Sequence, residues 1–451
     1  MTLTEMEIVS ISLFCAALVL CVILNISIII PLIFGLCVFT VYARLKKYTV
    51  KSIGKMIYKG VCGARNILIV FLMIGVLTAL WRDCGTIPAI INLAKDFIRS
   101  DTVILMTFLL CCLLSLLTGT SFGTAATMGV ICMTVANAMG ISPAFAGGAV
   151  LAGSFFGDRC SPVSTSALLV ADLTGTSIFD NIKGMLKSAI VPFLLSVVGY
   201  FVLGIVSGTD SALSVTQLPF ESEFSLHPSV FIPAAVIIVM SLFRVNVKLT
   251  MLASIIAAFV ISLAVQRNDV TELLRIAVFG YSSGNPEIAA MLDGGGVLSM
   301  LRSTAIVCIS SAYAGIFSET GMLSALKNKI SGLADSTTDY LATVVTSVFT
   351  GAVSCNQTLA IMLTHQLCEG KADKHSMAMN LEDTAVVIAP LIPWSIACAV
   401  PLTSVNAPFS AVFFAFFLYL LPMYRIVTSF IHKVTERRRN YENARYNQEK
   451  T

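Results

Sequence analysis

Long apolar stretches, separated by short polar motifs, dominate the chain. The first runs from Ile8 to Tyr42, and its length together with the interruptions at Asn25 and Pro31 predicts two short helices. Similar stretches follow at Asn66 to Trp81, Ile87 to Ile98, Thr102 to Leu117, Ala125 to Met139, Ala189 to Val206, Val230 to Phe243, Leu249 to Val265 and Val297 to Phe317. Several are shorter than the roughly 20 residues that a helix needs to cross a bilayer. The pattern predicts an all-α polytopic membrane protein with about a dozen helical segments, some of them interrupted or re-entrant.

The second half of the chain repeats the polar motifs of the first in the same order. The motif TGTSFGT around Gly119 corresponds to TGAVSCNQT around Gly351, and FGDRCSP around Asp158 corresponds to LEDTAVVIAPLIP around Asp383. Polar interruptions at matching positions of two halves are typical of secondary transporters, whose site lies between structural repeats near the middle of the bilayer.

This repeat divides the chain into five parts. They are the N-terminal spans with a basic connector (1–64), the first transport repeat (65–207), a linking segment with additional spans (208–296), the second transport repeat (297–432) and a basic tail (433–451).

Composition agrees with a membrane protein. Hydrophobic residues make up 57% of the chain and charged residues only 12%, whereas about a quarter of the residues in soluble domains are charged. The 13 cysteines are scattered through apolar segments without C-x-x-C spacing, so we expect packing residues rather than disulfides or a zinc site. The first apolar stretch lacks a basic leader, so no cleavable signal is expected.

The basic residues are unevenly placed. The connector from Arg44 to Arg65 carries lysines and arginines without an acidic residue, and the tail from Lys433 to Arg439 is also basic. The positive-inside rule therefore predicts a multi-pass protein of the cell membrane with the connector and the C-terminus in the cytoplasm. Beside membrane spans, such clusters indicate topology and not binding to nucleic acid.

Asp158 is the strongest candidate for chemistry. An ionisable residue at bilayer depth costs roughly 2.5 to 3.5 kcal/mol and persists mainly beside a polar cavity or an ion path. A carboxylate with nearby hydroxyls and carbonyls could hold Na+, and protons would compete for it. Alternatively, Asp158 pairs with Arg159 or caps the following helix. Glu382 and Asp383 are the matching acidic residues, with helix capping near the surface as their alternative.

Hydroxyl and amide side chains surround these acids in the sequence. Each could ligate a cation, but a serine or threonine can equally bond back to a helix carbonyl. The candidate ion- or proton-binding residues are Asp158, Asp383, Glu382, Thr120, Ser121, Thr124, Ser161 and Asn356, with Asp158 and Asp383 as the Na+ ligands. His365 could relay protons or lie at the interface, and Trp81 and Trp394 are expected to be interfacial anchors.

Other function classes find less support in the sequence. No P-loop, G-x-S-x-G, H-E-x-x-H or dinucleotide fingerprint occurs, so we expect a gradient-driven transporter with no cofactor, and not an enzyme. An ion channel would need a continuous pore, and the sequence contains no repeated filter motif that would indicate one.

At these motifs the chain resembles the NhaC family of Na+/H+ antiporters, within the ion transporter superfamily. The matching segments are TGTSFGTAATMG (Thr118 to Gly129), GGAVLAGSFFGDRCSPVS (Gly147 to Ser164) and LEDTAVVIAPLIPW (Leu381 to Trp394). The resemblance implies a secondary transporter that exchanges Na+ for H+ by alternating access.

Some members are similar to antiporters that couple these ions to organic acids such as malate and lactate, so exchange of a small organic solute is the alternative. One departure bears on this choice, because the family usually has aspartate where this chain has Thr165. The expected partners are therefore the lipid bilayer and either Na+ and H+ or an organic solute, and the sequence leaves open whether the chain forms a homodimer.

Overall fold

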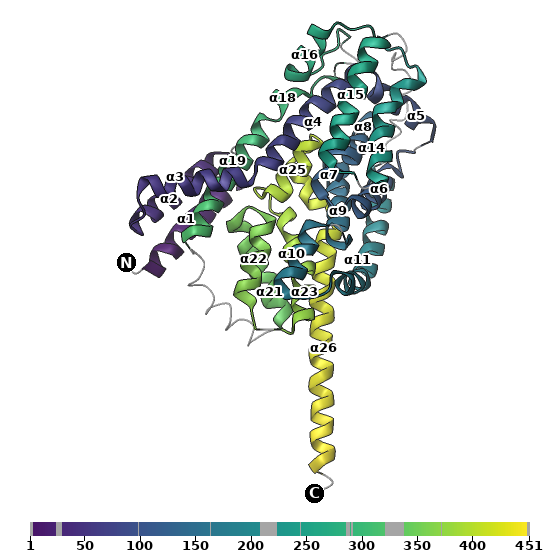
Figure 1. Ribbon diagram of the computed structural model, residues 1–451. Helices are drawn as coiled ribbons and strands as arrows, with labels where there is room; N and C mark the ends of the chain where they lie inside the picture. The colour runs from purple at the N-terminus through teal and green to yellow at the C-terminus, as the bar shows by residue number, and fades with distance from the viewer. Residues whose placement is uncertain are drawn as a thin grey trace.

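The computed structural model describes residues 3–23, 29–97, 99–162, 164–207, 223–243, 245–285, 289, 292–320, 338–370 and 372–448. Helices make up the fold of this part of the chain, which holds one isolated bridge, between Tyr281 and Gly294, and no strand (Figure 1). The predicted all-α membrane fold is confirmed. Three buried apolar clusters hold the helices together. The largest joins residues between Val103 and Tyr200 to residues between Ile361 and Leu421.

The helices of the first half run from α1 to α11. They are α1 (Leu3–Ile23), α2 (Ile29–Leu45), α3 (Val50–Gly63), α4 (Arg65–Asp83), α5 (Thr86–Phe97), α6 (Val103–Thr118), α7 (Ser121–Thr124), α8 (Val130–Ala138), α9 (Pro143–Cys160), α10 (Thr165–Thr174) and α11 (Ile178–Ser207). A π-helical turn, Ala125–Gly129, joins α7 to α8.

The second half begins with the linking helices. They are α14 (Ile232–Leu242), α15 (Val247–Ala264) and α16 (Val270–Phe279), followed by α18 (Gly296–Ser299), α19 (Leu301–Thr320), α21 (Asp339–Ser354), α22 (Gln357–Cys368), α23 (Lys374–Asp383), α24 (Ala385–Ile388), α25 (Ile396–Ser404) and α26 (Phe416–Gln448). The last helix, α26, projects beyond all the others in Figure 1. The sequence also matches the segment Leu80 to Ile98 with Ile316 to Ile330, pairing Gly85 with Gly321, and Gly321 lies outside the described residues.

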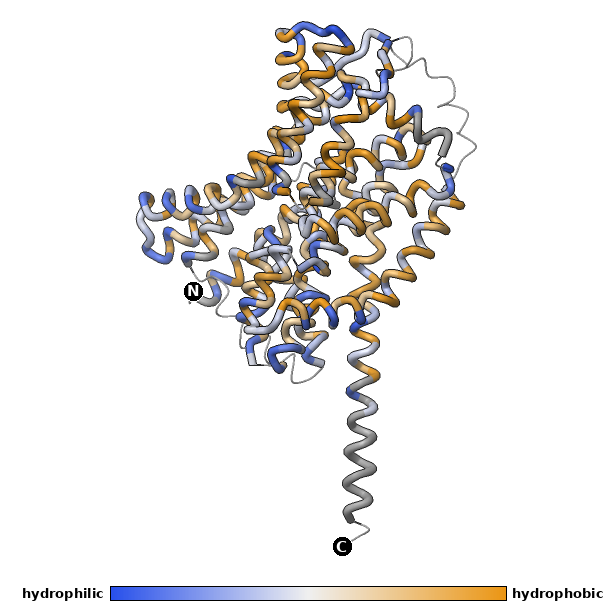
Figure 2. The backbone as a smooth tube through the Cα atoms, turned by 45° about the vertical axis from the view of Figure 1, so that its right-hand side comes forward, coloured by the Kyte–Doolittle hydropathy of each residue, from blue (hydrophilic) through white to orange (hydrophobic). Residues whose placement is uncertain are grey.

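Length and composition identify two described helical stretches that could cross a membrane, Ser121–Ala138 and Ile178–Ser207. Two bent pairs could add one span each, and one of these pairs joins Lys374–Leu391 to Ile396–Ser404 at 58°. Many of the remaining helices are apolar but short, as the sequence predicted, and apolar residues run along most helices in Figure 2.

The apolar stretch from Ala189 to Val206 marks only part of its helix, and reading Phe179 to Lys187 as a separate interfacial segment is wrong. The structure has a single 30-residue helix there, α11. The charged residues Asp180, Lys183 and Lys187 lie on its exposed side and do not interrupt its backbone. Further along, large apolar side chains spaced four residues apart are exposed, namely Ile190, Leu194, Val198 and Val202. Such a row fits a helix face that contacts lipid.

The expectation for Trp81 was also wrong. Its ring is 1% exposed, and its Nε1 donates a hydrogen bond to the Ser254 hydroxyl at 3.0 Å, so it is a packing residue between α4 and α15. Trp394 is half-buried and donates to the Ala352 carbonyl at 2.9 Å.

Corresponding breaks separate α6 from α7 and α21 from α22. The first break has Gly119 in the left-handed region (φ 64°) and Thr120 as the N-cap of α7. The second has Cys355 in the same region (φ 53°) and Asn356 as the N-cap of α22. The sequence had paired Gly119 with Gly351, four residues too early, because glycine is the usual residue at such a position and a cysteine there gives no signal.

The small residues of α9 let it pack directly against α6. A Cβ on Gly157 would lie 2.2 Å from the backbone nitrogen of Leu116, and one on Gly153 would lie 2.7 Å from the Phe108 carbonyl oxygen. Backbone atoms cannot turn away as side chains can, so glycine is required at this contact.

We expect Gly157→Ala to destabilise the protein by about 1–3 kcal/mol or more, because overpacking at a backbone contact forces the helices apart. The measurement is the thermal midpoint of unfolding in detergent. Gly54→Ala is the matched control, since a Cβ there would meet nothing within 4 Å. An equal effect of both variants would contradict the assignment of close packing to Gly157.

Candidate functional site

The ends of α9 and α23 bring four charged residues into the protein interior. Asp158 is 4% exposed, and Arg159, Glu382 and Asp383 are fully buried. The helix α9 ends because Ser161 is extended (φ −94°, ψ 136°), the conformation favoured before a proline such as Pro162. Asp158 in the last turn of α9 and Asp383 at the end of α23 therefore face other side chains instead of water.

Arg159 points away from Asp158 and pairs with Asp383 across the two repeats. Its Nη2 donates to the Asp383 carboxylate and, at 2.7 Å, to the Ser188 hydroxyl, and its Nη1 donates to the Met185 carbonyl at 3.0 Å. The other oxygen of Asp383 lies 2.7 Å from Nε of Arg425. Asp383 is thus balanced by two guanidinium groups.

Asp158 accepts hydrogen bonds only from neutral groups in the part of the chain that the structure describes. The Ser164 hydroxyl donates to Oδ1 at 3.1 Å, and the Gln357 amide donates to Oδ2 at 3.3 Å. No described basic side chain lies within 4 Å of this carboxylate. Both alternatives for Asp158 are therefore wrong, because Arg159 is committed to Asp383 and Ser164, not Asp158, caps α10.

Glu382 is the least satisfied group of the cluster. It is fully buried, and neither of its carboxylate oxygens has a hydrogen-bond partner. An ionised carboxylate in such surroundings is costly, so Glu382 requires either a bound proton or a bound cation. Gln357 links the two repeats nearby, since its amide donates both to Asp158 and to the Val386 carbonyl, four residues after Glu382.

The other candidate side chains are mostly engaged with the backbone. Thr124 donates to the Thr120 carbonyl at 2.9 Å and Ser161 to the Leu116 carbonyl at 2.8 Å, while Thr120 and Asn356 cap helices. Ser121 is buried at the start of α7. A hydroxyl that donates to a carbonyl still has lone pairs for a cation, so the role of these residues as ion ligands stays a prediction. His365 lies half-buried in the last turn of α22.

Sequence reasoning missed Arg425, which contacts Asp383 from α26. Its guanidinium also lies over the Tyr340 ring, 5.2 Å from the centroid, and the Tyr340 hydroxyl donates to the Asp383 carbonyl at 3.1 Å. A signal was present, since Arg425 interrupts the apolar segment FFLYLLPMYRIV. Ser188 gave no such signal, because one serine among apolar residues is common.

Comparison with known sequences now identifies the family. A sequence model of the Na+/H+ antiporter family matches residues 2–175 and 155–432. The chain belongs to this family. Among curated relatives, the Na+/H+ antiporter NhaC of Bacillus subtilis is 28% identical over 418 residues, covering 90% of this chain and 92% of that protein.

Two further curated relatives are similar to this chain over most of their length. NhaC of Alkalihalophilus pseudofirmus is 26% identical, covering 89% of this chain and 90% of that protein. The malate-2H+/Na+-lactate antiporter of Bacillus subtilis is 23% identical, covering 77% of each chain. The resemblance to NhaC is confirmed. Membership makes the chain a multi-pass membrane protein whose relatives are transporters.

Proposed function

We propose that the chain is a secondary active Na+/H+ antiporter, in which Na+ and protons compete for Asp158. The observation that carries this proposal is that Asp158 is buried without a basic partner, although an arginine adjoins it in the sequence. The pairing of Arg159 with Asp383 leaves Asp158 available for a mobile ion.

The charge balance of the site supports a monovalent ion. The buried cluster contains three carboxylates, those of Asp158, Glu382 and Asp383, and two guanidinium groups, those of Arg159 and Arg425, which both pair with Asp383. With every group ionised, the cluster has one uncompensated negative charge, which one Na+ or one proton neutralises. Occupied and empty states then differ in charge, and this difference can bias the two conformers of an alternating-access cycle.

The hydroxyls near Asp158 complete the proposed ion site. Ser164 hydrogen-bonds to the side chain of Asp158 and Ser166 to its carbonyl. Thr120 caps α7, Ser121 and Thr124 belong to α7, and α7 packs against α9, the helix of Asp158. Oxygen ligands of this kind suit a hard cation. We place the protein in the cell membrane with the basic connector and the C-terminus in the cytoplasm, and we propose transport without a bound cofactor or enzymatic activity.

Exchange of an organic acid is the second candidate, favoured by the similarity to the malate-2H+/Na+-lactate antiporter. The presence of Thr165 where the family usually has aspartate gives little support to organic-acid exchange. The Thr165 side chain is exposed, whereas the neighbours on either side, Ser164 and Ser166, are buried and contact Asp158.

We expect Na+ to dissipate an imposed proton gradient in proteoliposomes that contain the wild-type protein, with saturation at high Na+ concentration. The measurement is the fluorescence of an enclosed pH indicator after addition of Na+, K+ or Li+. Saturable exchange of malate for lactate, with no response to any of the three cations alone, would contradict the proposal and favour the second candidate.

A further inference from the structure

Two cavities meet at Arg425. The larger, of about 660 Å³, is lined by Asp339, Asp373, Asn380 and Lys433, among others. The smaller, of about 370 Å³, reaches Asp383 and is also lined by Lys187 and Ser188. Arg425 and Thr428, one turn apart on α26, line both cavities.

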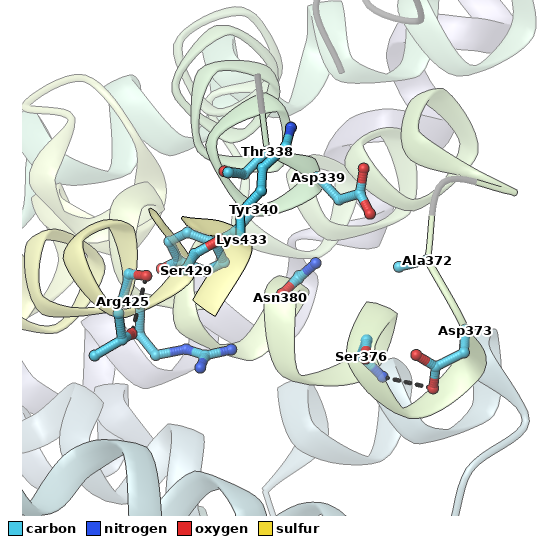
Figure 3. A pocket seen from close by; sticks show the side chains of 11 residues that line it. Thr338, Asp339, Tyr340, Ala372, Asp373, Ser376, Asn380, Arg425, Ser429 and Lys433 are labelled. Carbon is cyan, nitrogen blue, oxygen red and sulfur yellow. Dashed lines mark hydrogen bonds between the residues drawn. The ribbon is translucent and has the colours of Figure 1, made fainter. Parts of the chain in front are cut away.

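Most of the side chains that line the larger cavity are charged or polar. Figure 3 shows Arg425 and Ser429 of α26 on one side, Asp373 and Ser376 at the start of α23 on the other, and Asn380 between them. Carboxylates, a lysine, hydroxyls and an amide line it, and opposite charges are present in equal number among Asp339, Asp373, Arg425 and Lys433. Charged groups are costly to remove from water, so side chains of this kind favour a cavity that water fills.

At the inner end of these cavities, a partly exposed side chain directly contacts a fully buried one. The Arg425 side chain is 28% exposed, while its partner Asp383 and the next residue in the network, Arg159, are fully buried. Of the two basic residues that line the smaller cavity, Arg425 is the one that contacts a buried carboxylate, whereas Lys187 is exposed. The Tyr340 ring and Asp383 hold its guanidinium in place on two sides.

We propose that these cavities form the vestibule by which hydrated cations reach the buried carboxylates, and that Arg425 closes its inner end. The inference rests on the antiport proposed above. A fixed guanidinium repels Na+ and protons, so passage requires the contact between Arg425 and Asp383 to open. Because Arg425 is partly exposed, this contact can open without burying an unpaired arginine. Arg425 is thus a positioning residue, which prevents protons from crossing without a counter-ion.

We expect Arg425→Ala to make the protein leak protons in the absence of Na+, and to lower the apparent KM for Na+ by about five-fold. Removal of one positive charge near the path changes the free energy of a cation by about 1 kcal/mol in hydrated surroundings. Arg425→Lys should restore most of the coupling because it keeps the charge. The measurement is the decay of an imposed pH gradient in proteoliposomes, first without Na+ and then at increasing Na+ concentrations.

Lys433→Ala is the matched control. It removes a positive charge from the same cavity, in which Lys433 is not at the end that reaches Asp383. We expect Lys433→Ala to stay coupled, with no proton leak. Tight coupling and an unchanged KM in Arg425→Ala would overturn the inference, even where the wild-type protein exchanges Na+ for H+. Failure of the wild-type exchange itself would instead overturn the proposed function.

If Arg425→Ala does not fold, a second variant tests whether the larger cavity is the vestibule. Ser429 lies one turn after Arg425 and lines the larger cavity, so Ser429→Trp should fill the vestibule without disturbing the ion pair. We expect slower exchange in this variant and no proton leak. Exchange at the wild-type rate would overturn the assignment of the cavity as the vestibule.

Discussion

Replacing Asp158 by asparagine is expected to abolish Na+-driven proton movement while the protein still folds. A Na+ ion about 4 Å from a unit negative charge gains about 4 kcal/mol at an effective dielectric constant near 20, and each 1.4 kcal/mol is about tenfold in affinity. Loss of that charge should therefore lower Na+ affinity by about 1,000-fold. The asparagine also cannot exchange a proton at the pH of transport, so both halves of the cycle fail.

The same substitution should leave the fold intact because the site around Asp158 contains neutral donors. The asparagine carbonyl can accept from the Gln357 amide, which keeps its hydrogen bond to the Val386 carbonyl, and the asparagine NH2 group can donate to the Ser164 hydroxyl. The measurement is exchange in proteoliposomes together with the thermal midpoint in detergent.

Asp172→Asn is the matched control for this experiment. It makes the same chemical change at an exposed carboxylate on α10, the helix that Ser164 caps, and it should leave exchange unchanged. Na+/H+ exchange at the wild-type rate in Asp158→Asn would refute the role of Asp158 as the exchanged ligand.

The helix breaks were predictable because they depend on local sequence. Gly119 takes a left-handed conformation that glycine adopts without strain, and Ser161-Pro162 ends α9 where the sequence placed the break. The corresponding break in the second half was misplaced because Cys355 adopts the same conformation without being glycine. Local patterns thus located the helix breaks in the first half of the chain, but placed the break between α21 and α22 four residues too early.

The pairing of charges was not predictable, since it depends on which segments meet in space. Arg159 lies beside Asp158 in the sequence, yet its guanidinium pairs with Asp383, 224 positions away. The third member, Arg425, comes from α26, outside the motifs that suggested the site. Sequence reasoning therefore found the acidic residues and could not assign which of them is neutralised by the protein itself.

That distinction leads to opposite expectations for two neighbouring acids. Asp383→Asn should destabilise the protein by about 3–5 kcal/mol, because it leaves the fully buried Arg159 without a counter-charge. Glu382→Gln should leave stability unchanged or raise it, because both oxygens of Glu382 are buried without a partner and an amide carries no charge to bury. Thermal unfolding of the two variants in detergent measures this difference. An equal loss of stability in Glu382→Gln would mean that Glu382 also belongs to the ion-pair network.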